Sequence, residues 1–278
     1  MPCPDQLDPG FGIGPPHRNA ICFAKSYFGI GPDGLGIYRT GTGFLIDNGN
    51  VRRHVLTAAH NVFHHDVRRE AVWISLWFGR NGATALATRD ATGWSFPQAF
   101  EDAHVAPGDC DYALLRINPL GADRFNGLPV AVSTAQGLTE KLLVGYPDEG
   151  TCKGKAEPWH ARLSVEPSSP KTYHYVDQPT YAGMSGGPLL TGNTAGDGYK
   201  AWGIHIRGGD TEQQRAIRFS ESVYEEIMSL SLIHILNLLR FIVRLHCWAG
   251  LYSNLEENAG LRPPVTTTVL RLLALSWV

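Results

Sequence analysis

The chain has 278 residues, of which 43% are hydrophobic, and its formal net charge is -2. It can therefore bury a substantial core, either as one large domain or as two small barrels that share an interface. The nearly balanced charge gives no reason to expect a nucleic acid or an anionic membrane as a partner.

Strand-like segments fill the first half of the chain. Residues 1–18 are rich in proline and glycine, so we expect a flexible N-terminal arm there. After this arm, short apolar runs end at turn residues, a pattern that predicts β-strands. The runs are ICFAKSYF (21–28), GTGFLID (41–47), HVLTAAH (54–60), AVWISLWFG (71–79) and YALLRI (112–117).

The second half continues in the same way after a turn-rich stretch at residues 118–129, which we expect to link two halves. Its predicted strands are KLLVGYP (141–147), ARLSV (161–165), TYHYVDQ (172–178), GGPLLTG (186–192) and YKAWGIHIRG (199–208). Residues 220–230 then predict a helix, capped by Ser220, with Val223, Ile227 and Leu230 on one face. Strands followed by one helix predict an all-β protein.

The tail, residues 230–278, differs from the rest. It begins with an apolar stretch that contains scattered arginine and histidine, so a helix at a membrane surface is one interpretation. Arg240 and Arg244 interrupt any span long enough to cross a bilayer. A third interpretation concerns the gene, because LSLIHI (230–235) is what a widely used sequencing-library adapter encodes in one reading frame. We therefore expect this tail to be disordered or spurious.

The five cysteines, at irregular spacing and without a C-x-x-C pair, do not predict a disulfide framework, a zinc site or a redox motif. Cys110 and Cys152 are candidates for one disulfide. The first residues contain no basic region followed by an apolar region, so no secretory signal is predicted. We expect an intracellular protein unless the N-terminus is incomplete.

Three short segments carry the chemistry. LTAAHNV (56–62) places a histidine after a strand-like run, and GDCDYALLRI (108–117) places an acid directly before a strand. AGMSGGPLL (182–190) flanks a serine with glycines, which let the backbone turn tightly and expose the hydroxyl group and nearby N–H groups. The third segment is much more specific than the other two.

Together these segments predict one catalytic mechanism. His60 has a side chain whose ordinary pKa suits the transfer of a proton near neutral pH, and it can activate the Ser185 hydroxyl group. Asp111 would hold the imidazole in the required tautomer. The backbone N–H groups of Gly183 and Ser185 are the candidate donors of an oxyanion hole.

The order His, Asp, Ser, within TAAH, D-x-A-L and G-x-S-G-G-P, resembles the trypsin-like (chymotrypsin-fold) serine peptidases. The resemblance covers about residues 36–229. It implies two antiparallel six-stranded β-barrels, with the active site in the cleft between them, and a C-terminal helix. The first barrel would span residues 19–125, and the second barrel with the helix would span residues 126–229.

Two positions differ from the pattern of the animal trypsins and indicate a subgroup of the family. Met184 stands where animal trypsins have an aspartate that pairs with a new N-terminal amine, so activation by that route is not expected. Asn61 stands where a cysteine usually follows the histidine. Both features make the chain more similar to the V8-like glutamyl endopeptidases.

The resemblance also indicates a specificity. Pro179 occupies the position of the aspartate that selects lysine or arginine in trypsin, which disfavours that preference. Thr180 and His205 resemble the pair that binds a substrate carboxylate in the glutamate-specific group, and a hydroxyl group and an imidazole can both donate hydrogen bonds to it. We therefore expect a preference for an acidic residue before the cut. The alternative is that His205 only fills a strand, with its ring bonded to the backbone.

Two alternatives remain open. The chain could be a catalytically inactive binding module of the same fold, although such a module has no need of all three catalytic groups. A lipase or esterase shares the Ser/His/Asp chemistry but places its histidine last in the sequence. For a peptidase we expect a polypeptide substrate, a monomer, and neither cofactor nor metal ion.

Overall fold

The computed structural model describes most of the chain up to residue 230. The described residues are 5–6, 17–47, 53–103, 108–121, 123–134, 136–149, 152–175, 180–191, 199–207 and 214–230. The expected N-terminal arm and the expected tail therefore lie largely outside the described residues. Strands dominate, which confirms the all-β class, and no helix of the described part is long and apolar enough to cross a membrane.

The first barrel consists of six antiparallel strands that close in the order β2-β3-β4-β9-β8-β7. These strands are β2 (Ile21–Ile30), β3 (Gly36–Leu45), β4 (His54–Thr57), β7 (Trp73–Phe78), β8 (Ala87–Ser95) and β9 (Ala113–Ile117). Each predicted run of this half contributes one strand. Strand β8 was not predicted, because its sequence ATRDATGWS has few large apolar residues and none of its side chains is fully buried.

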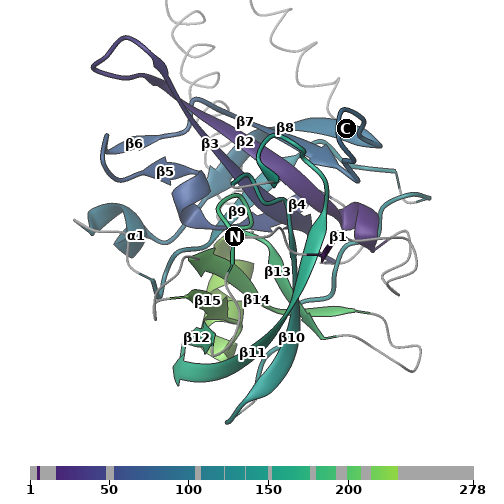
Figure 1. Ribbon diagram of the computed structural model, residues 1–278. Coiled ribbons are helices and arrows are strands. Elements are labelled where there is room, and N and C mark those ends of the chain that lie inside the picture. The colour runs from purple at the N-terminus through teal and green to yellow at the C-terminus, as the bar shows by residue number, and fades with distance from the viewer. Residues whose placement is uncertain are drawn as a thin grey trace, which may run out of the picture. The chain divides into compact units, whose positions relative to one another are not determined.

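The second barrel closes through β10-β11-β12-β15-β14-β13, since β13 pairs with β10 and β12 pairs with β11. Its strands are β10 (Thr139–Gly145), β11 (Trp159–Ser169), β12 (Thr172–Tyr175), β13 (Pro188–Thr191), β14 (Lys200–Arg207) and β15 (Arg215–Arg218). Strand β1 (Asp5–Gln6) adds to β11. In Figure 1 the purple and blue strands form the first barrel, and the teal and green strands form the second.

Short elements complete the fold. A small hairpin follows the segment that contains His60, and three short helical segments lie in the first half of the chain. These elements are β5 (Phe63–His64), β6 (Arg69–Glu70), η1 (Arg18–Ala20), η2 (Ala59–Asn61) and α1 (Gln98–Asp102).

The segment between the barrels is hydrogen-bonded to both of them. Leu128 donates its N–H to the carbonyl oxygen of Leu45 at the end of β3 (2.8 Å). Three residues later, Ala131 donates its N–H to the carbonyl oxygen of Ala201 in β14 (2.9 Å). The linking segment is thus an extended strip that fastens one barrel to the other.

The predicted C-terminal helix is confirmed over residues 221–230. Val223, Ile227 and Leu230 are buried, as the helical spacing predicts. The hydroxyl oxygen of Ser220 accepts a long hydrogen bond from the N–H of Val223 (3.5 Å). The buried face belongs to a hydrophobic cluster that contains residues of both barrels, so the helix is part of the main core.

The cysteines do not form the candidate disulfide. Cys22 and Cys110 are buried free thiols, and burial raises the pKa of Cys110 to about 12. Cys152 is disulfide-bonded. The candidate Cys110–Cys152 pairing is therefore wrong.

Replacing Ile227 by alanine should lower the free energy of unfolding by about 2–5 kcal/mol. The side chain is 0% exposed, so its removal leaves a cavity in the core. Glu225→Ala, at an exposed position of the same helix, is the matched control and should change stability by no more than about 0.5 kcal/mol. Urea unfolding of both variants measures the difference, and equal losses would contradict a packed C-terminal helix.

Candidate active site

His60 and Asp111 are brought together by the pairing of two strands. His60 lies in the short helix that follows β4, and Asp111 lies just before β9. Strands β4 and β9 pair antiparallel with Thr57 opposite Ala113, so the end of one meets the start of the other. This register places the carboxyl group beside the imidazole.

Two hydrogen bonds fix the imidazole. Asp111 accepts one at Oδ1 from the backbone N–H of His60 (2.9 Å) and one at Oδ2 from Nδ1 (2.7 Å). Because a carboxylate can only accept, the proton of the neutral imidazole lies on Nδ1, and Nε2 then carries a free electron pair. The Asp111 side chain is only 7% exposed, which strengthens both bonds by excluding water.

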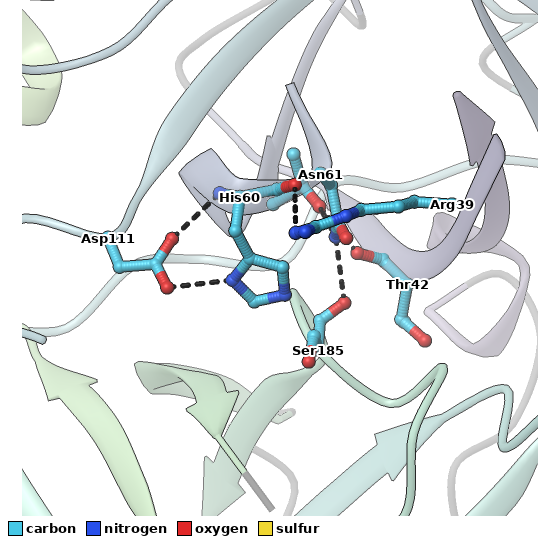
Figure 2. Close-up of polar contacts among 7 residues, drawn as sticks. Arg39, Thr42, His60, Asn61, Asp111 and Ser185 are labelled. Carbon is cyan, nitrogen blue, oxygen red and sulfur yellow. Dashed lines mark hydrogen bonds and ion pairs between the residues drawn. The ribbon is translucent and has the colours of Figure 1, made fainter. Parts of the chain in front are cut away.

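Ser185 lies in a turn at residues 182–187, just before β13, and comes from the second barrel. Figure 2 shows Ser185 and Asp111 on opposite sides of the His60 ring. The structure thus brings the three predicted residues together from segments far apart in the sequence.

Two glycines make the serine turn possible. Gly183 and Gly186 have φ values of +88° and +91°, in the left-handed region that favours glycine. A Cβ atom on Gly186 would also collide with the carbonyl oxygen of Thr42 and the hydroxyl group of Thr57. The turn is therefore pressed against the first barrel too closely for any other residue at this position.

Thr42, in β3, holds the serine turn in place. Its N–H donates to the carbonyl oxygen of Ser185 (2.8 Å), and its hydroxyl group donates to the carbonyl oxygen of Gly183 (2.8 Å). The same hydroxyl oxygen accepts a hydrogen bond from the N–H of Tyr146 (2.9 Å). A single fully buried threonine of the first barrel thus contacts three backbone groups of the second.

Asn61 adds a second connection between the barrels. Its Nδ2 donates to the carbonyl oxygen of Ser185 (3.0 Å) and to the hydroxyl oxygen of Thr57 (2.9 Å). The amide fills the space beside Gly41, where a Cβ atom would collide with it. Asn61 therefore links the segment that carries His60 to the serine turn.

The serine turn also presents two backbone donors. Within the described part of the chain, neither the N–H of Gly183 nor that of Ser185 has a hydrogen-bond acceptor. These are the two groups that the sequence predicts for an oxyanion hole. An unpaired pair of N–H groups on one tight turn can bind a developing negative charge.

Thr180 precedes the serine turn in the sequence and His205 follows it, and both side chains are buried. Thr180 is 1% exposed and His205 is 0% exposed, and Thr180 Oγ1 and His205 Nε2 have no hydrogen-bond partner in the described part of the chain. The His205 backbone exchanges hydrogen bonds with Gly186 and Gly187 (2.7 and 2.9 Å), which places this strand directly beside the serine turn. Buried unpaired polar atoms are unusual and favour a binding role.

The charge state of His205 follows from its surroundings. Burial lowers the pKa of His205 to about 3, and the positive charge that His60 carries when it is protonated acts in the same direction, whereas the Arg215 carbonyl oxygen acts in the opposite direction. The imidazole is therefore neutral near pH 7 in the free protein.

Other predicted positions have simpler surroundings. Met184 is fully buried in a second hydrophobic cluster, and Pro179 lies outside the described residues. The described residues include no group of three or more histidine, cysteine, aspartate or glutamate side chains that could hold a metal ion.

Sequence reasoning missed several residues of the site. Thr42 gave no signal beyond its place between two glycines, and Asn61 was noticed only as a departure from a family pattern. Arg39 was missed although its guanidinium donates to the carbonyl oxygen of His60 (3.1 Å), and so was Tyr175, which contacts His205. Their contacts are with residues far away in the sequence, which no local pattern reveals.

The family model for the trypsin-like peptidase domain matches residues 41–196, a range that contains all three predicted catalytic residues. The chain belongs to the trypsin-like peptidase family. It is a serine-type endopeptidase with the chymotrypsin fold, as the two closed barrels independently indicate. A search of curated proteins gave no match.

Solved structures agree with the fold. A Glu endopeptidase in complex with MPD is 21% identical, with a TM-score of 0.60, over 76% of this chain and 90% of that chain. The thermostable serine protease AL20 from an extremophilic microorganism is 15% identical, with a TM-score of 0.59, over 77% and 98%. The protease Anisep from Arthrobacter nicotinovorans is 17% identical, with a TM-score of 0.57, over 77% and 97%.

Asn61→Ala should lower the free energy of unfolding by about 1–3 kcal/mol, because it leaves the Ser185 carbonyl oxygen and the Thr57 hydroxyl oxygen each without one donor. Urea denaturation measures the loss. Gln136→Ala removes an exposed amide and is the control, with an expected change within about 0.5 kcal/mol. If the two variants were equally stable, Asn61 would not be a connection between the barrels.

Proposed function

We propose that the protein hydrolyses peptide bonds through an acyl-enzyme intermediate, with His60, Asp111 and Ser185 as its catalytic triad. The observation that carries this proposal is the double hydrogen bond from His60 to Asp111. It leaves the electron pair of Nε2 available on the side of the ring where Ser185 lies (Figure 2). The family membership supports the same reaction.

The proposed reaction has two halves. His60 Nε2 takes the proton of the Ser185 hydroxyl group as Oγ attacks the carbonyl carbon of the substrate. The negative oxygen that forms accepts hydrogen bonds from the N–H groups of Gly183 and Ser185. The imidazolium, stabilised by Asp111, then gives its proton to the leaving amine. In the second half, His60 takes a proton from a water molecule as the water oxygen attacks the ester carbonyl carbon. His60 then returns this proton to Ser185 Oγ as the C–O bond to the serine breaks and the acid is released.

The second candidate function is a catalytically inactive binding module that has kept the fold. Two observations disfavour it. The hydrogen bonds of Asp111 select the one tautomer that a general base needs, and the N–H groups of Gly183 and Ser185 have no acceptor among the described residues. A binding module gains nothing from either arrangement.

We further propose a preference for glutamate before the cut, with Thr180 and His205 as donors to its carboxylate. Both side chains are buried and end in polar atoms that have no partner in the described residues. Hydrogen bonds to an ionised acceptor are roughly twice as strong as those to a neutral one, which favours glutamate over glutamine. Because His205 is neutral in the free protein, the preference rests on hydrogen-bond donation rather than on a fixed positive charge.

The wild-type protein should react covalently with a fluorophosphonate reagent at Ser185, whereas Ser185→Ala should not react. Gel detection of the label measures this difference. Absence of labelling in the wild-type protein would favour the inactive binding module.

Asp111→Asn should reduce kcat by about 10⁴-fold, because the amide no longer imposes the Nδ1–H tautomer. The rate of peptide hydrolysis measures this effect.

Peptides that differ only in glutamate, glutamine or phenylalanine before the cut test the specificity. We expect kcat/KM to be highest for glutamate, about tenfold above glutamine, because the carboxylate strengthens both hydrogen bonds. Phenylalanine, which has no acceptor, should be the poorest of the three. Equal cleavage of the glutamate and glutamine peptides would remove the carboxylate-binding role of His205.

A further inference from the structure

Tyr175 is the one described side chain that is hydrogen-bonded to the His205 ring. It ends strand β12, and its hydroxyl group lies 2.9 Å from Nδ1 of His205. The two rings are stacked, with their centroids 5.6 Å apart and their planes at 23°. Tyr175 is 4% exposed and His205 is 0% exposed, so water does not compete for this hydrogen bond.

The hydrogen bond determines which ring nitrogen carries the proton. A neutral imidazole has one donor and one acceptor nitrogen, and a phenol has a single proton to donate. If Tyr175 donates to Nδ1, both groups of this hydrogen bond are satisfied and Nε2 carries the proton. If Nδ1 carries the proton instead, the hydroxyl proton of Tyr175 and the electron pair of Nε2 are both left buried without partners. The first arrangement leaves fewer unsatisfied groups and is favoured.

Both residues are neutral near pH 7, as this reasoning requires. Burial raises the pKa of Tyr175 well above its ordinary value, so the phenol keeps its proton. Burial is also the largest cause of the lowered pKa of His205, and protonation of His60 would act in the same direction. Protonation of Nδ1 would moreover take away the only acceptor that the Tyr175 hydroxyl group has among the described residues.

We propose that Tyr175 is a positioning residue for substrate specificity, because its hydroxyl group holds His205 in the neutral tautomer whose Nε2–H donates to the substrate. This inference rests on the proposed preference for glutamate before the cut. The buried Nε2 and the buried Thr180 Oγ1 have no partner in the described residues, so both are available as donors. The substrate side chain that completes this arrangement must end in an acceptor, as a carboxylate does.

Removal of the Tyr175 hydroxyl group should therefore change selectivity more than overall activity. In Tyr175→Phe, Nδ1 has lost its donor, and the imidazole can move its proton to Nδ1 and present Nε2 as an acceptor. A glutamate carboxylate would then face an electron pair, whereas a glutamine amide can offer either its oxygen or its N–H group. Glutamate should lose about tenfold in kcat/KM, and glutamine and phenylalanine should lose little.

Tyr173→Phe is the matched control. Tyr173 lies two residues earlier in the same strand and is fully buried, but its hydroxyl group is hydrogen-bonded to Ser133 rather than to His205. The Tyr173→Phe substitution therefore removes an equivalent buried hydrogen bond from the second barrel. The ratio of glutamate to glutamine cleavage should fall in Tyr175→Phe and stay unchanged in Tyr173→Phe. Equal effects of the two variants on this ratio would overturn the proposal.

A spectroscopic measurement tests the same point without substrate. Nitrogen-15 NMR of protein labelled at histidine distinguishes a protonated from an unprotonated ring nitrogen, and the spectrum of His205→Gln identifies the signals of His205. We expect the proton on Nε2 in the wild-type protein and a shift toward Nδ1 in Tyr175→Phe.

The two possible failures give different readouts. A proton on Nδ1 in the wild-type protein would overturn the role of Tyr175. Equal wild-type cleavage of the glutamate and glutamine peptides would instead overturn the glutamate preference itself, whatever the NMR spectrum shows.

Discussion

The serine turn depends on the hydrogen bonds of Thr42. This fully buried threonine belongs to the first barrel, yet its N–H and its hydroxyl group bind the carbonyl oxygens of Ser185 and Gly183 in the second. Gly186 must have no side chain, because the turn approaches the Thr42 carbonyl oxygen so closely. The position of the serine relative to His60 is thus set by hydrogen bonds from the backbone and the side chain of Thr42 to carbonyl oxygens of the other barrel.

The other half of the site is assembled within one barrel. His60 and Asp111 meet because β4 and β9 pair in a register that brings their ends together, and buried hydrogen bonds then fix the imidazole. Ser185, in contrast, belongs to the second barrel. Asn61, next to His60 in the chain, completes this connection by also binding the Ser185 carbonyl oxygen. Rigid placement of this kind is what a catalytic group requires, since small displacements cost much of the rate.

The proposed specificity site depends on a different physical effect. Its buried polar atoms lack hydrogen-bond partners in the free protein, and a bound ligand would supply them. A histidine and a threonine are kept from water with polar atoms that no described residue satisfies, an arrangement that costs stability. An acceptor on the substrate would satisfy these polar atoms and offset the cost, and this gain is the physical basis of the proposed preference for glutamate. In the proposed arrangement, the hydrogen bond from Tyr175 to Nδ1 of His205 keeps the ring proton on Nε2, which is the donor to the substrate.

The sequence by itself determined the all-β class, most of the strands, the C-terminal helix and the three residues of the proposed triad. Alternation of apolar residues, turn residues and the glycines around Ser185 are local features, so they can be recognised without a structure. Strands β8 and β15 were missed because they have few large apolar residues and depend on their neighbours for pairing. Only the tertiary structure showed the roles of Thr42, Asn61 and Tyr175. These roles depend on contacts with Ser185 or His205, which lie between 30 and 143 positions away along the chain.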